Sequence, residues 1–94
     1  MNYDLLLDEA IKHLQEYLQI KTINPPGNEI EGARFFKKIF DTESIPCELF
    51  EPSPGRGSIL ATLKADGAKR PILLLNHMDV VPVEREHWEV DPFE

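Results

Sequence analysis

The 94-residue sequence contains a single cysteine, three histidines and no long apolar segment. Cys47 cannot form an internal disulfide, which is typical of proteins in a reducing compartment. No stretch approaches the roughly 20 apolar residues that a membrane-spanning helix requires. The N-terminus lacks a basic region followed by an apolar segment, so no secretory signal is indicated. We therefore expect a cytoplasmic protein with no membrane partner, in which Cys47 is a half-buried strand residue and not a reactive thiol.

Basic residues are also in deficit, because 10 lysines and arginines are outnumbered by 17 aspartates and glutamates, for a net charge of −7. Nucleic-acid binding requires a basic face, and this composition argues against one. Gly55-Arg56-Gly57 lacks the third glycine and the strand-to-helix position of a phosphate-binding loop. The sequence therefore predicts neither a nucleic-acid partner nor a nucleotide site.

The first half of the sequence has the pattern of two amphipathic helices. Apolar residues at helical spacing predict a helix over Asp4–Gln19, and the segment Asn24–Gly27, with two prolines and a glycine, ends that pattern. Asn28 followed by Glu31 resembles a capping box at the start of a second helix over Glu29–Asp41. Leu7, Ile11, Leu14 and Leu18 form the apolar face of the first helix, and we expect the second helix to bury Ile30, Ala33, Phe36, Ile39 and Phe40.

The second half is predicted to contain three strands. Cys47–Glu51 and Ser58–Lys64 flank a turn-rich segment and are expected to form an antiparallel pair. Pro71–Asn76 contains the run Ile72–Leu75, whose side chains are apolar on both faces, as in a parallel sheet covered by helices. The predicted class is α/β, in the order helix, helix, strand, strand, strand.

The third predicted strand needs more cover than these elements provide. Two helices and one hairpin can cover one face and one edge of such a strand, and the other face and edge remain without a partner. We therefore expect residues 1–94 to be the N-terminal, incomplete part of a larger catalytic α/β domain.

His77 and Asp79 follow the apolar run directly, and they are the candidate site residues. In open α/β sheets, ligands bind at the carboxyl ends of the strands. Imidazole is a common zinc ligand, and its second ring nitrogen usually donates to a carboxylate, a role that Asp79 could fill. A catalytic zinc takes about three protein ligands. We interpret His13 and His87 as surface residues, so the other ligands must lie outside this sequence.

The stretch Leu73–Phe93, LLLNHMDVVPVEREHWEVDPF, resembles a family of zinc-dependent amidohydrolases and exopeptidases. That family includes aminoacylase, acetylornithine deacetylase, succinyl-diaminopimelate desuccinylase and glutamate carboxypeptidase. Its pattern is His-x-Asp-x-Val-Pro followed by Trp and Asp-Pro-Phe. The segment Ile20–Glu29 also resembles the entry to the second helix in this family. The resemblance covers nearly the whole chain, as the N-terminal part of the family's catalytic domain.

The resemblance implies a three-layer helix-sheet-helix catalytic domain, interrupted in the family by a lid domain that often mediates dimerisation and is absent from this sequence. It implies that His77 binds one of two Zn²⁺ ions, with Co²⁺ as an alternative metal, and that Asp79 supports His77 and is needed for activity. Trp88, Pro92 and Phe93 match positions that pack around the site. The remaining metal ligands and the glutamate base would lie beyond Glu94.

The implied reaction is cleavage of an amide bond in N-acyl amino acids or small peptides by metal-activated water, in a full-length protein that forms a homodimer. The 94 residues alone are expected to be inactive and to bind zinc weakly or not at all. One alternative is a non-catalytic binding module that retains the fold without a metal centre. Another is that His77 and Asp79 merely end a strand. The metal interpretation requires the imidazole to face Asp79 at the rim of the sheet and not to lie on the outside of the molecule.

Overall fold

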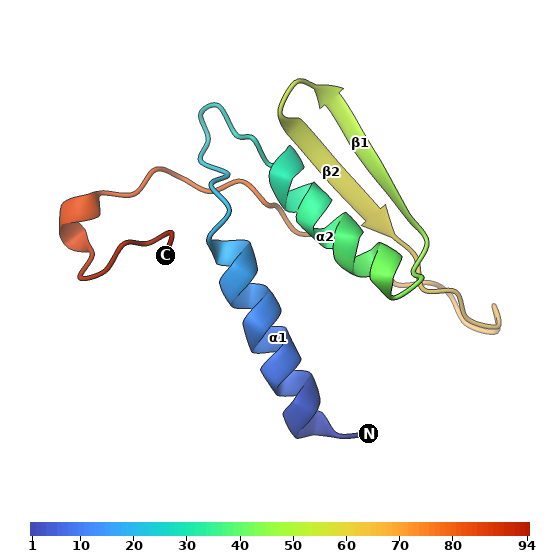
Figure 1. Ribbon diagram of the computed structural model, residues 1–94. Coiled ribbons are helices and arrows are strands. Elements are labelled where there is room, and N and C mark those ends of the chain that lie inside the picture. Colours follow the sequence, from blue (N-terminus) through green and yellow to red (C-terminus); the bar gives the residue numbers. More distant parts are fainter.

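The computed structural model describes all 94 residues. Figure 1 shows a helix α1 that stands apart from a second helix, α2, and a β-hairpin, with a long irregular segment that leads to the C-terminus. The regular elements are α1 (Tyr3–Leu18), α2 (Ile30–Thr42), β1 (Cys47–Ser53), β2 (Arg56–Ala61) and a short 3-10 helix η1 (Arg85–His87). Neither α-helix is long and apolar enough to cross a lipid bilayer.

Helix α1 confirms the first predicted helix, but its apolar face is not buried. Asn2 caps the start of the helix, and its side-chain oxygen accepts a hydrogen bond of 3.2 Å from the Leu5 amide. No residue of α1 is buried. The apolar side chains of Leu7, Ile11, Leu14 and Leu18 are exposed, because no other element covers them.

Helix α2 also lies where it was predicted, but a different interaction satisfies its first turn. Asn28 has a positive φ of 60° and Glu29 makes no side-chain capping bond, so the predicted capping box is not formed. Instead, the Ile30 amide donates to the carbonyl oxygen of Gly55, in the hairpin turn, at 3.2 Å. The start of α2 is therefore satisfied by a residue that lies far along the chain.

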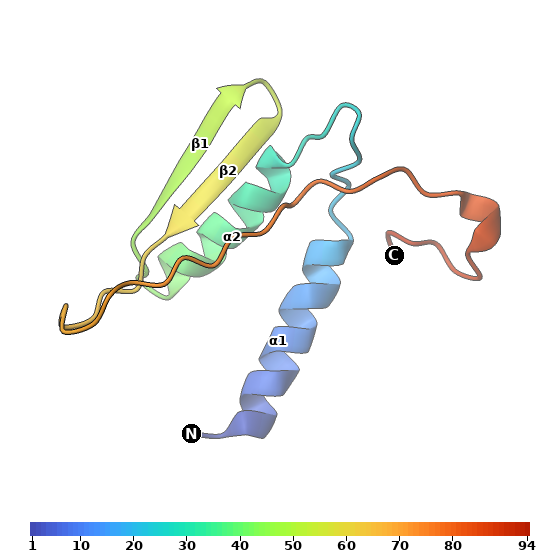
Figure 2. The same cartoon turned by 180° about the vertical axis from the view of Figure 1, so that it is seen from behind.

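Strands β1 and β2 confirm the predicted antiparallel pair, with Cys47 opposite Ala61 and Phe50 opposite Ser58. Cys47 is half-buried and unpaired, as expected. Helix α2 packs on this hairpin, and Figures 1 and 2 show it lying along the two strands. Gly57 allows the close approach, since a Cβ atom there would lie 2.7 Å from the Ile30 Cα atom.

The buried core is small, because only Ile30 and Ala33 are fully buried apolar residues. The other apolar residues predicted to be buried in α2, namely Phe36, Ile39 and Phe40, are half-buried. Tyr17 of α1 contacts two α2 rings, with ring centroids 4.8 Å from Phe36 and 6.0 Å from Phe35. Burial in this aromatic cluster raises the pKa of Tyr17 above its ordinary value.

The third predicted strand is not formed. Residues 71–76 have no strand partner, and the four side chains from Ile72 to Leu75 are 73–89 % exposed. An isolated strand has no hydrogen-bond partner for its backbone, and no backbone–backbone hydrogen bond joins residues 71–76 to another segment. The structure therefore corrects the predicted order to helix, helix, strand, strand. It confirms a mixture of helices and strands, with one two-stranded antiparallel sheet.

Candidate functional site

The site is built where two segments that are distant in sequence run side by side. Ile23 and Val80 form an isolated parallel β-bridge. The Asn24 amide donates to the Val80 carbonyl at 2.8 Å, and the Val80 amide donates to the Thr22 carbonyl at 3.0 Å. The hydroxyl of Thr22, which is 2 % exposed, donates to the Met78 carbonyl at 2.7 Å. These three hydrogen bonds, which we call the backbone clamp, hold residues 22–24 against residues 78–80.

Met78 packs into the molecule between the two candidate site residues. Its sulfur lies 3.5 Å from the point where a Cβ atom of Gly32 would stand, so the small residue in α2 makes room for it. Met78 is half-buried, whereas the neighbouring His77 is exposed. The segment 77–79 is therefore anchored by its central residue and by the backbone clamp, although it belongs to no strand.

The His77 ring faces Asp79, as the metal interpretation requires. Its Nδ1 atom lies 2.8 Å from the Asp79 carbonyl oxygen and 3.3 Å from the carboxylate oxygen Oδ1. Both neighbours are acceptors, so a neutral ring carries its proton on Nδ1 and leaves the lone pair of Nε2 available to a metal ion. The side chain is 84 % exposed, so the other requirement, that the ring should not lie on the outside of the molecule, is not met within these 94 residues. Its exposure follows from the absence of the third strand.

Asp79 is held more firmly than His77. Its carboxylate oxygen Oδ2 accepts a hydrogen bond of 2.9 Å from the Asn24 side-chain amide, and Arg56 Nη2 lies 3.8 Å from the same oxygen. The Asn24 hydrogen bond, and to a lesser extent the nearby His77 ring, hold the pKa of Asp79 below its ordinary value. Asp79 is therefore a carboxylate at neutral pH, and its oxygen Oδ1 remains available as an acceptor beside His77 Nδ1.

Arg56 connects this carboxylate to the hairpin. Its Nε atom lies 2.5 Å from Oε1 of Glu29, whose side chain is 11 % exposed. This contact with Glu29, more than the distant Asp79, raises the pKa of the Arg56 guanidinium. The sequence analysis missed Asn24 and Arg56 as site residues. Asn24 lies in the segment that resembles the family, but its contact with Asp79 spans 55 residues and no local pattern reports it.

An open hollow lies beside the His77–Asp79 pair. It is lined by Asn24, His77, Asp79, Val80 and Val81. Two of these residues are apolar, and the three polar ones are the members of the network described above. The hollow therefore brings the three polar residues of this network together with two valines.

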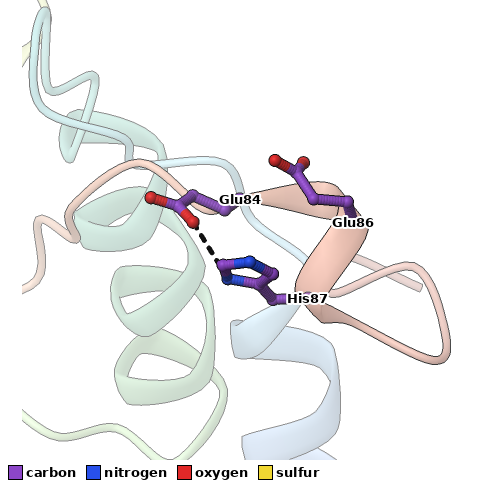
Figure 3. Close-up of side chains that lie close together, drawn as sticks. All are labelled: Glu84, Glu86 and His87. Atoms are coloured by element: carbon purple, nitrogen blue, oxygen red, sulfur yellow. Dashed lines mark ion pairs between the residues drawn. The ribbon is translucent and has the colours of Figure 1, made fainter.

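The other two histidines differ in their surroundings. His13 is half-buried against the Phe35 ring, with Nε2 3.4 Å from a Glu9 carboxylate oxygen, so the prediction of a solvated surface ring is only partly correct. His87 is exposed, as expected, and its Nδ1 atom lies 2.9 Å from Glu84 Oε2. Figure 3 shows this ion pair together with Glu86, and one potential ligand atom from each of the three residues lies within 4.8 Å of the others.

Glu84, Glu86 and His87 form the one group of three potential metal ligands in the structure, and all three are exposed. Exposed acidic groups are common without a metal ion. His77 belongs to no such group, so the chain supplies a single histidine at the candidate site. Trp88 is 46 % exposed and does not pack as the resemblance implied, whereas Phe93 is half-buried with the Lys21 ammonium 5.6 Å from its ring centroid.

Comparison with known proteins shows that the chain is similar to aminoacylases and to a desuccinylase. Human aminoacylase-1 is 35 % identical over 86 residues, which cover 90 % of this chain and 21 % of the relative. Aminoacylase-1 of Dictyostelium discoideum is 28 % identical over 89 residues. A probable succinyl-diaminopimelate desuccinylase of Staphylococcus aureus is 33 % identical over 88 residues, or 92 % of this chain and 21 % of that protein. No family model and no solved structure matches the chain.

These relatives represent the amidohydrolase family of the aminoacylase and desuccinylase type. The chain belongs to this family and corresponds to its N-terminal part. It spans about one fifth of the length of the curated relatives it matches. The His77–Asp79 pair and the Asn24 segment both lie within the 94 residues, so the structure describes their mutual arrangement.

Proposed function

We propose that this chain is the N-terminal part of a metal-dependent hydrolase that uses activated water to cleave an amide bond in N-acyl amino acids or small peptides. The observation that carries the proposal is the His77 ring, whose Nδ1 faces two oxygens of Asp79. That arrangement is how proteins orient a metal-binding imidazole. The similarity to aminoacylases and a desuccinylase supports the reaction class.

The donor set fits one ligand of a zinc centre. In this proposal His77 holds the metal through Nε2, and Asp79 keeps the ring in the required tautomer and increases the basicity of the nitrogen. A zinc site of this kind takes about three protein ligands, so the others come from parts of the protein outside these 94 residues. The chemistry that such a centre supplies is a water acidic enough to attack an amide near neutral pH, together with polarisation of the amide carbonyl.

The proposal includes the three-layer catalytic domain, two Zn²⁺ ions per complete site, dimerisation of the full-length protein and a cytoplasmic location. The unpaired, half-buried Cys47 supports a reducing compartment. We also propose that the 94 residues alone are inactive, because a single histidine does not complete a catalytic zinc site.

The test is zinc binding by the full-length gene product and its variants. We expect His77→Ala to remove one bound zinc per chain and to abolish hydrolysis of N-acetyl amino acids. The matched controls His13→Ala and His87→Ala should retain both. Equal zinc content in His77→Ala and the wild type would contradict the proposal. A wild-type protein that binds no zinc but forms a stable complex with another protein would favour the binding-module alternative.

A further inference from the structure

The two carboxylate oxygens of Asp79 have different neighbours. Oδ2 accepts the 2.9 Å hydrogen bond from Asn24 Nδ2 and has Arg56 Nη2 at 3.8 Å. Oδ1 lies on the side of the His77 ring, 3.3 Å from Nδ1. A carboxylate with one oxygen held by a hydrogen bond and drawn toward a nearby guanidinium does not turn freely about its side-chain bonds. The position of Oδ1 beside His77 is therefore set by the groups that hold Oδ2.

Asn24 is suited to this task because its backbone is already fixed. The backbone clamp holds residues 22–24 against residues 78–80 through the amides of Asn24 and Val80 and the hydroxyl of Thr22. None of these hydrogen bonds involves the Asn24 side chain. Only the amide nitrogen of that side chain can donate, which is the role that a carboxylate acceptor requires. Removing the amide would leave the clamp in place and release the carboxylate.

Arg56 is a second, more distant neighbour of the Asp79 carboxylate. It is closer to Glu29 than to Asp79, at 2.5 Å against 3.8 Å, so its main partner is the carboxylate of Glu29. The guanidinium still places positive charge near Oδ2 and favours the same orientation of the Asp79 carboxylate. Asn24 therefore makes the hydrogen bond and Arg56 supplies a weaker, longer-range attraction.

We infer that Asn24 is a positioning residue that orients the Asp79 carboxylate toward His77 and thereby tunes this imidazole as a metal ligand. The inference rests on the proposed metal-dependent function. Asn24 touches neither the metal-binding nitrogen nor a substrate, and it acts only through Asp79. Changes to groups that support a metal ligand in this indirect way typically cost about 10–100-fold in metal affinity.

The test measures zinc affinity and thermal stability in the full-length gene product, with zinc alone as the probe and a chromophoric chelator as competitor. Asn24→Leu removes the donor at nearly constant volume, and Asn24→Asp replaces it with a carboxylate that repels Asp79. We expect the zinc Kd to rise about 10–100-fold in Asn24→Leu and further in Asn24→Asp. The melting temperature of the metal-free protein should change by only a few degrees.

Thr22→Val is the matched control, because it deletes one bond of the clamp and leaves the Asn24 amide in place. It should lower the melting temperature and leave the zinc Kd unchanged. A purely structural role for Asn24 would produce the same pattern in Asn24→Leu. An unchanged Kd in Asn24→Leu, with binding abolished in His77→Ala, would overturn the inference and leave the proposed function standing.

A second measurement covers the case in which the proposed function itself fails. The ¹H–¹⁵N signal of the His77 Nδ1–H group, recorded in metal-free protein near pH 9, reports the Asp79 oxygens around it, namely the backbone carbonyl oxygen at 2.8 Å and the carboxylate oxygen Oδ1 at 3.3 Å. We expect this signal to shift and to exchange faster with solvent in Asn24→Leu but not in Thr22→Val. If zinc does not bind even to the wild type and the signal is the same in all three proteins, Asn24 does not position Asp79.

Discussion

Glu29 and Arg56 form an ion pair that joins the start of α2 to the first residue of β2, with Arg56 Nε 2.5 Å from Glu29 Oε1. The two partners are unequally exposed, because the Glu29 side chain is 11 % exposed and the Arg56 side chain is 41 % exposed. Removing the arginine would leave a largely buried carboxylate with no charged partner. Burying such a charge is costly, so this pair should matter more than a surface pair.

The first prediction follows from this asymmetry. Arg56→Met should lower the melting temperature by several degrees, because the Glu29 carboxylate loses its partner. Arg34→Met is the matched control, since Arg34 pairs with Glu31 on the exposed side of α2 and surface pairs contribute little. Differential scanning calorimetry compares the two variants. Equal effects would show that the Glu29–Arg56 pair is no more important than the exposed pair.

The second prediction concerns the contact between α2 and β2. A Cβ atom at position 57 would lie 2.5 Å from Ile30 Cδ1 and 2.7 Å from Ile30 Cα, so backbone must move to make room. We expect Gly57→Ala to destabilise the fold by about 1–3 kcal/mol, as overpacking does. Ser58→Ala, at the exposed neighbouring position, should have little effect. Urea denaturation measures both, and a fully stable Gly57→Ala variant would contradict the packing described for α2.

The third prediction separates the core from the exposed apolar run. Ile30 is 2 % exposed and Leu74 is 89 % exposed. In the 94-residue chain, Ile30→Ala should cost about 2–5 kcal/mol, and Leu74→Ala should change stability by less than about 0.5 kcal/mol.

The same Leu74→Ala substitution in the full-length gene product tests whether the run becomes a buried strand there. If it does, the substitution should cost about as much as Ile30→Ala. A negligible cost in both proteins would show that the run from Ile72 to Leu75 is a surface segment.

The fourth prediction is a pH dependence from the Lys37–Asp41 pair on α2, in which Nζ lies 2.7 Å from Oδ2. The hydrogen bond lowers the pKa of Asp41 below its ordinary value and raises the pKa of Lys37 above its own. The Asp41 contribution to stability is therefore complete above its unfolded pKa of about 4 and is lost as the pH falls through the lower folded value. The Lys37 contribution is complete below about pH 10 and is lost as the pH rises through the higher folded value.

Asp41→Asn should remove both of these limbs from a plot of melting temperature against pH. The change should be small, at most a few degrees, because both side chains are exposed, and it should shrink in 1 M salt. Measurements between pH 3 and pH 11 at two salt concentrations provide the check. An effect that survives high salt would show that the pair acts through packing and not through charge.

Much of the local structure could be predicted from the sequence because its causes are local. The 3.6-residue spacing of Leu7, Ile11 and Leu14 is sufficient to indicate α1, and the turn-rich segment between Cys47 and Ser58 is sufficient to indicate a hairpin. The predicted capping box is not formed, because Asn28 adopts a positive φ. The Ile30 amide at the start of α2 donates to the carbonyl oxygen of Gly55 instead. That outcome depends on where the hairpin turn lies, which no pattern near Asn28 reports.

The sequence by itself determined the helices, the hairpin, the family and the proximity of His77 to Asp79, because each depends on residues that are neighbours or on a recognisable motif. Only the tertiary structure decided that Asn24 and Arg56 meet the Asp79 carboxylate, since these contacts join segments separated by tens of residues. It also decided that the run Ile72–Leu75 stays exposed, because a strand forms only where another backbone is present to accept its hydrogen bonds.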